Sequence, residues 1–127
     1  MAPTPGHRAT GDLSVLDAAA LLALVGGDEE LMREIIALYL VEYPRLLRDI
    51  RAAAASGDAR ALELSAHALK GSVGNMAASR ASEAARELET LARADQLPAA
   101  RDSLATLEHE LARLHDALLP GTEPAQA

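Results

Sequence analysis

Several residue types are missing from this chain of 127 residues. It has no cysteine, which excludes disulfides, thiolate metal sites and cysteine nucleophiles. It also has no phenylalanine or tryptophan and only two tyrosines, so its apolar half is almost entirely Ala, Leu, Val, Ile and Met. Because this composition, rich in Ala and Leu and poor in aromatic residues, favours helices over a sheet, we predict an all-α protein.

Long apolar runs and an excess of basic residues are also missing. The N-terminus has no apolar core of signal-peptide length, and no other stretch is long enough without charge to span a bilayer. We therefore expect a cytoplasmic protein with no membrane partner. The net charge of −7 argues against nucleic-acid binding, which requires a basic face that displaces counterions.

The sequence contains no nucleotide-binding or hydrolytic motif. It has no P-loop, no Gly-rich dinucleotide turn, no kinase nucleotide site and no Ser-His-Asp pattern. No Glu precedes a His by three residues, the spacing that carboxylate-bridged metal sites in helical bundles use. We expect no cofactor and no metal bound by this chain.

The length fits one domain, and turn-forming residues divide it into helices. We expect flexible tails over residues 1–11 and 120–127 and one helical domain over residues 12–119. The predicted helices are a short one capped by Asp17, a long one capped by Asp28, a third over about 59–76, a fourth after Ser79, and a last one after Pro98. Gly57-Asp58 is expected to end the second of these helices and to start the third. The short connections predict an up-down-up-down antiparallel four-helix bundle with a short additional N-terminal helix.

Apolar periodicity assigns a buried side to each long helix. In the second helix Pro44 is expected to cause a kink rather than a stop. The predicted buried positions are Leu31, Ile35, Leu38, Leu46 and Ile50 in the second helix, Ala81, Ala84, Ala85, Leu88 and Leu91 in the fourth, and Leu104, Leu107, Leu111, Leu114 and Leu118 in the last. His109 and His115 lie off this last seam and are expected to face solvent.

The third helix presents a histidine, His67, on its solvent side. At 100° per residue, the opposite side gathers the apolar stripe and two small serines, namely Leu62, Ser65, Leu69, Ser72, Val73 and Met76. The face of His67 itself holds Arg60, Glu63, Leu64, Lys70, Gly71 and Gly74. The imidazole is therefore predicted to be presented to a partner and not packed in the core.

Two features of that face indicate a function. Gly71 and Gly74 each cost a helix interior about 1 kcal/mol relative to Ala, and they remove side chains from the surface beside the imidazole. Lys70 is the one lysine of the chain, and its side chain leans back toward His67, where an ammonium could neutralise a phosphoryl group. Residues 60–80 carry three cations against one carboxylate, a mildly positive region in an acidic chain.

The stretch His67-Ala68-Leu69-Lys70-Gly71-Ser72 resembles the H-x-L-K-G-S signature of histidine-containing phosphotransfer (HPt) domains. The resemblance covers roughly residues 12–119 and includes Gly26-Gly27-Asp28, residues 31–44, Leu46-Leu47, Gly57-Asp58 and the Leu88-Glu89 region. The chain departs from the family at Ala77, where Gly is frequent, and at Tyr39, where Phe is common.

The resemblance implies a phosphorelay function, in which a phosphoryl group moves from a receiver-domain aspartate or a kinase to His67 and then to a response-regulator aspartate. It implies that His67 is the phosphoacceptor, that Lys70 stabilises the phosphate, and that Arg60, Leu64, Gly71 and Gly74 form the docking surface. The partners would be receiver domains and a sensor histidine kinase, which can be a hybrid kinase. Magnesium would belong to the receiver, and the chain would act as a monomer without kinase activity of its own.

Two other interpretations stay open at this point. The chain could be a helical adaptor that binds signalling partners without being phosphorylated, a difference that replacing His67 by Gln would reveal. It could also be a metal-binding or enzymatic bundle, which the missing Glu-x-x-His pairs and the absence of cysteine disfavour.

Overall fold

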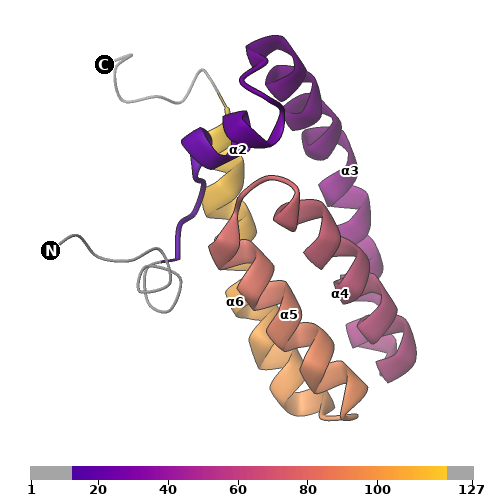
Figure 1. Cartoon of the computed structure of the whole chain (residues 1–127). Coiled ribbons are helices and arrows are strands. Elements are labelled where there is room, and N and C mark those ends of the chain that lie inside the picture. The colour runs from indigo at the N-terminus through magenta and orange to yellow at the C-terminus, as the bar shows by residue number, and fades with distance from the viewer. Residues whose placement is uncertain (1–12, 120–127) are drawn as a thin grey trace, which may run out of the picture.

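The computed structural model describes residues 13–119, and all regular secondary structure in that range is helical. Five helices follow one another: α2 (Ala18–Leu24), α3 (Glu29–Ser56), α4 (Ala59–Gly74), α5 (Ser79–Arg93) and α6 (Leu97–Leu118) (Figure 1). The expected tails, 1–11 and 120–127, lie outside the described residues.

Aspartate caps define the starts of three helices, as the sequence predicts. The side chains of Asp17, Asp28 and Asp58 each accept a hydrogen bond from the backbone N–H three residues later, at 3.0 Å. Gly57 ends α3 in the left-handed conformation, with φ of 74°. These caps place His67 in the middle of α4.

The long helices pack around one apolar core. α3 contacts α4, α4 contacts α5, α5 contacts α6, and α6 returns to α3, while short α2 contacts α3. The fully buried large side chains are Leu21, Ile50, Leu62, Leu69, Val73, Met76, Leu88, Leu107, Leu111 and Leu114. Because Leu62, Ala66, Leu69 and Val73 of α4 face this core, the opposite side of α4 faces solvent.

The predicted buried side of α3 is wrong at two positions. Leu31 is 40% exposed and Leu38 is 69% exposed, whereas Tyr39 is buried and its ring stacks on Tyr43. Figure 1 shows the reason, since the first half of α3 extends beyond the end of α4 and has fewer helices around it. The helix also continues through Pro44 to Ser56, as predicted.

The expectation for His115 also requires correction. His109 is exposed, but His115 is only partly exposed, and its Nδ1 lies 2.7 Å from the Tyr43 hydroxyl. The prediction failed because it considered α6 alone, and α3 supplies a tyrosine beside this residue. His115 thus serves the packing of α6 on α3.

Candidate functional site

His67 lies on the exposed face of α4, and 64% of its side chain is accessible to solvent. Its imidazole Nδ1 is 2.8 Å from Oε2 of Glu89 on the neighbouring helix α5. The imidazole is therefore open to a partner on one side and held in place on the other.

Glu89 is the central acceptor of this site. It is only 4% exposed, although it is a carboxylate. Its Oε1 lies 2.8 Å from Lys70 Nζ, and its Oε2 also lies 2.9 Å from the Arg93 guanidinium. A buried charge is tolerated only when it is paired and hydrogen-bonded, as it is here.

The cations around Glu89 keep it ionised. The hydrogen bond from Lys70 is the largest cause that lowers the pKa of Glu89 below its ordinary value, and the hydrogen bond with His67 acts in the same direction. Burial opposes this shift but does not reverse it. An ionised carboxylate has no proton to donate, so the imidazole must donate from Nδ1. The lone pair of the neutral ring then lies on Nε2.

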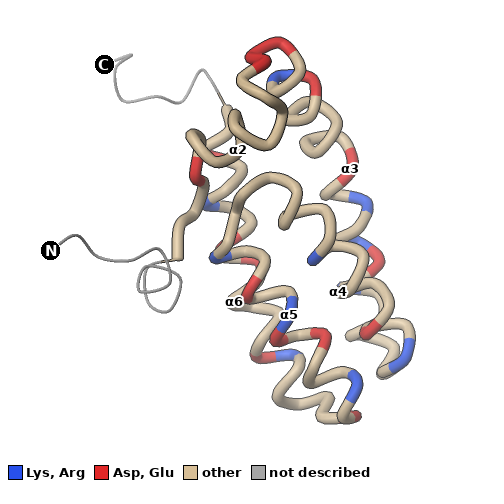
Figure 2. The backbone as a smooth tube through the Cα atoms, viewed as in Figure 1, with Lys and Arg blue, Asp and Glu red and all other residues tan. Residues whose placement is uncertain are grey.

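A second carboxylate extends the network along α4 and α5. Glu63 bonds Arg93 of α5 at 2.9 Å and Arg60 of α4 at 3.2 Å. The Arg93 hydrogen bond is the largest cause that lowers the pKa of Glu63. Figure 2 shows charges of both signs along α5. Glu89 of this helix bonds His67, and Arg93 of the same helix bonds Glu89.

The other residues that the sequence singles out also gather on the outer side of α4. Arg60 is exposed, Leu64 is 53% exposed, and both glycines are exposed. A Cβ added at Gly71 would meet nothing within 4 Å, and one at Gly74 would lie 3.9 Å from the Ser82 hydroxyl. Packing inside the described part of the chain therefore does not require glycine at position 71.

Lys70 has a partner that the sequence did not reveal. Its ammonium bonds Glu89 across the α4–α5 boundary, 2.8 Å from Oε1. Lys70 and His67 share this one carboxylate, so the ammonium is held close to the histidine by a common partner.

Sequence reasoning missed Glu89, Arg93 and the bonded role of Glu63. One signal was present, because Glu89 interrupts the apolar stripe of α5 between the buried residues Ala85, Leu88 and Ala92. A charge at a buried position of an amphipathic helix indicates a partner on the facing helix. The sequence does not say which residue of α4 that partner is.

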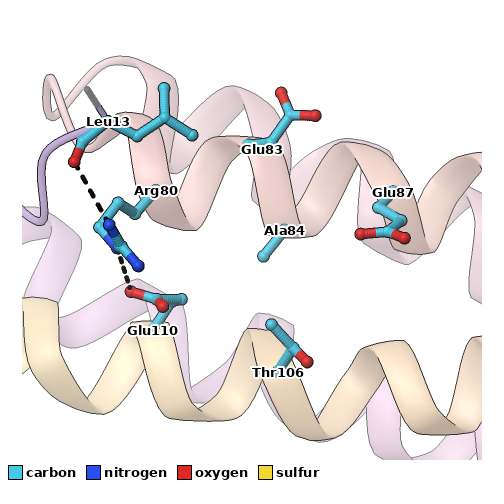
Figure 3. A pocket seen from close by; sticks show the side chains of 7 residues that line it. All are labelled: Leu13, Arg80, Glu83, Ala84, Glu87, Thr106 and Glu110. Carbon is cyan, nitrogen blue, oxygen red and sulfur yellow. Dashed lines mark hydrogen bonds and ion pairs between the residues drawn. The ribbon is translucent and has the colours of Figure 1, made fainter. Parts of the chain in front are cut away.

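A separate hollow lies between α5 and α6 (Figure 3), lined by Leu13, Arg80, Glu83, Ala84, Glu87, Thr106 and Glu110. The guanidinium of Arg80 is engaged there by Glu110 at 3.3 Å and by the Leu13 carbonyl at 3.5 Å. No cluster of three or more His, Cys, Asp or Glu side chains that could hold a metal ion is found within residues 13–119. The exposed histidine on α4 remains the candidate site.

Comparisons with known proteins identify a family and a solved structure that the chain resembles. The family model of the Hpt domain matches residues 34–117. Among solved structures, the chain is similar to histidine-containing phosphotransfer protein B (HptB) from Pseudomonas aeruginosa PAO1. The TM-score is 0.75, with 30% sequence identity, over 81% of this chain and 90% of that chain. The comparison with curated proteins found no match.

Proposed function

Because the chain belongs to the Hpt domain family, we propose that it carries phosphoryl groups in a two-component phosphorelay, with His67 as the phosphoacceptor. The phosphoryl group would come from a receiver-domain aspartate or from a kinase and pass to a response-regulator aspartate. The observation that carries this proposal is an exposed imidazole whose Nδ1 is held at 2.8 Å by a buried, ionised carboxylate.

The chemistry follows from the tautomer that Glu89 selects. The Nε2 lone pair attacks the phosphorus of an aspartyl phosphate, and the aspartate leaves as a carboxylate. Lys70 and His67 both bond Glu89, and the Lys70 ammonium has three N–H donors, so it would bond a phosphoryl oxygen on His67 while one donor stays on Glu89. The magnesium ion for this transfer would belong to the receiver, with no cofactor on this chain.

The docking surface would surround His67 on α4. Gly71 and Gly74 have no side chains, so a partner can approach the imidazole closely. Leu64 offers an apolar contact, and Arg60 adds a cation at the edge of this surface. A carrier must release one partner before it meets the next, so we infer a small, short-lived interface with receiver domains and a sensor histidine kinase.

The finer architecture belongs to the same proposal. We infer an up-down-up-down antiparallel four-helix bundle of α3 to α6, with α2 as the short additional helix and a monomer as the working form. No helix among residues 13–119 combines the length and apolar character that a membrane crossing requires. We propose that the protein acts in the cytoplasm, where response regulators work.

Mass spectrometry of the protein after mixing with a phosphorylated receiver domain tests the function. We expect an acid-labile phosphoryl group on His67, and none in the His67→Gln variant, which should fold normally because this side chain is exposed. His109→Gln is the matched control, since His109 is also exposed, on α6. A His67→Gln variant that keeps full signalling activity would instead identify a helical adaptor.

A further inference from the structure

The first half of α3 presents apolar side chains that no other helix of the described chain covers. Within residues 13–119 five large apolar side chains are exposed, and three of them, Leu31, Leu38 and Val41, lie on this half-helix. Leu38 is 69% exposed and Val41 is 79% exposed. This is the part of α3 that extends beyond the end of α4 (Figure 1). Exposed apolar side chains that gather on one face indicate a binding surface, whereas scattered ones do not.

Two exposed charges frame these apolar residues on the same face of the helix. At 100° per residue, Glu34, Leu38, Val41 and Arg45 fall within an arc of about 60°. We call these four residues the α3 stripe. Glu34 makes no ion pair within residues 13–119. Arg45 bonds Glu42 at 2.6 Å, and its guanidinium has further N–H donors for another carboxylate.

The order of residues in the α3 stripe is symmetric, with opposite charges at its two ends. Glu34 precedes Leu38 by four residues, and Arg45 follows Val41 by four residues. When two copies of this helix pair in antiparallel order about a two-fold axis, Leu38 of each copy lies against Val41 of the other. The same axis brings Glu34 of each copy to Arg45 of the other, so two apolar contacts lie between two ion pairs.

The charges also select the direction of pairing. In a parallel pair about a two-fold axis, each residue would lie opposite itself, so Glu34 would meet Glu34 and Arg45 would meet Arg45. Like charges that face each other oppose association, whereas the antiparallel order pairs each charge with its opposite. The α3 stripe is therefore complementary to itself in antiparallel order alone.

We propose that the α3 stripe is a self-association surface on which a second copy of this chain docks in antiparallel order. The surface is separate from the candidate site, because α4 contacts both α3 and α5, and His67 bonds Glu89 on the α5 side. Pairing through α3 leaves the imidazole open. The inference does not rest on the role of His67, and each copy keeps the ability to work as a monomer.

The association should be weak and reversible. The α3 stripe spans about 17 Å of helix at 1.5 Å per residue, which is short for a stable interface. Each copy also carries a net charge of −7, so the two copies repel each other. We expect a dimer dissociation constant between about 10 μM and about 1 mM, with the monomer dominant in dilute solution.

Sedimentation velocity of the full chain across this concentration range tests the apolar part of the surface. The wild type should sediment faster as its concentration rises, and Leu38→Glu should remain a monomer throughout. Leu64→Glu is the matched control, because Leu64 is an exposed leucine of α4 outside the α3 stripe, and it should associate as the wild type does. Equal association of Leu38→Glu and the wild type would overturn the proposal.

Exchange of the two charges tests the antiparallel order. Glu34→Arg alone places two arginines opposite each other, and Arg45→Glu alone places two glutamates opposite each other, so each variant should weaken the dimer by at least about tenfold. The double variant re-forms both ion pairs with their signs exchanged and should return to within about threefold of the wild type. A double variant that associates as weakly as the single variants would overturn this pairing.

Two further outcomes would also overturn the inference. One is a wild type that stays monomeric up to about 1 mM. The other is a monomeric wild type whose Leu38 and Val41 NMR signals shift when a receiver domain is added, which would assign the α3 stripe to the receiver instead of to a second copy. Neither outcome affects the proposed role of His67, which phosphorylation of the monomer tests separately.

Discussion

Ala77, in the connection between α4 and α5, has a backbone conformation that alanine rarely adopts. Its φ is 55°, in the left-handed region, where the Cβ of an L-residue meets the neighbouring carbonyl. Its carbonyl accepts a hydrogen bond from the Asp17 N–H at 3.0 Å, so the conformation anchors the segment before α2. The strain is retained because the turn needs this geometry.

Ala77→Gly should therefore stabilise the protein. Relief of the left-handed strain exceeds the loss of a half-buried methyl group and the added freedom of the unfolded chain, for a net gain of up to about 1 kcal/mol. Urea denaturation measures this gain. Asp95→Gly is the matched control, since Asp95 has a φ of 59° but aspartate tolerates this region better than alanine. A gain at Asp95 as large as at Ala77 would contradict the explanation.

Some residues of the candidate site could be predicted from the sequence of α4 alone, and others only from the packing of α4 against α5. His67, Leu64 and the two glycines could be placed on the exposed face because helical periodicity alone assigns the sides of α4. Glu89 could not be assigned to His67, because 22 residues and a turn separate them and the contact depends on how α5 packs against α4. The local pattern reveals the histidine, and only the tertiary structure reveals its partner.

The elements themselves show the same division. Aspartates and glycines at positions 17, 28, 57 and 58 predicted the helix ends because capping is a local interaction. The buried side of α3 was mispredicted at Leu31 and Leu38, since burial depends on whether another helix lies alongside at that height. Periodicity describes which residues share a face of a helix, and not how far along the helix that face is covered.

Gly71 makes helix α4 less stable than alanine at the same position would. Replacing Gly71 by Ala introduces a methyl group that meets nothing within 4 Å, so the helix should gain up to about 1 kcal/mol in the free energy of unfolding. The same methyl group rises from the surface one turn after His67, and we expect slower phosphoryl transfer from a receiver domain. Urea denaturation and the transfer rate of the same variant are compared with wild type.

Ala68→Gly supplies the opposite control on the same helix. Ala68 is exposed and next to His67 in sequence, so its replacement should destabilise α4 by about 1 kcal/mol without adding bulk at the surface. If Gly71→Ala gains stability and transfers at the wild-type rate, the glycine does not serve docking.

At the scale of the whole molecule, the carboxylates shared by α4 and α5 link the stability of the fold to pH. Lys70, as the largest cause, lowers the pKa of Glu89 below its ordinary value of 4.5, and Arg93, as the largest cause, lowers that of Glu63. A carboxylate with a lowered pKa in the folded state stabilises that state above its unfolded pKa. This contribution is lost as the pH falls through the lowered value.

Acid should therefore reduce the difference in stability between the wild type and Glu89→Gln. Near pH 7 the variant should unfold more easily by about 1 kcal/mol, because Lys70 and Arg93 lose a charged partner that joins α4 to α5. As the pH falls from about 5 to below the lowered pKa of Glu89, protonation of this carboxylate removes the same charge from the wild type, and the two free energies of unfolding should converge. Urea denaturation at both ends of this range measures the convergence. Glu87→Gln is the control, because Glu87 is an exposed residue of α5. This variant should match the wild type within about 0.5 kcal/mol at every pH. A difference between wild type and Glu89→Gln that persists unchanged down to the most acidic pH at which both proteins fold would mean that the carboxylate stabilises the helix pair through its shape and not through its charge.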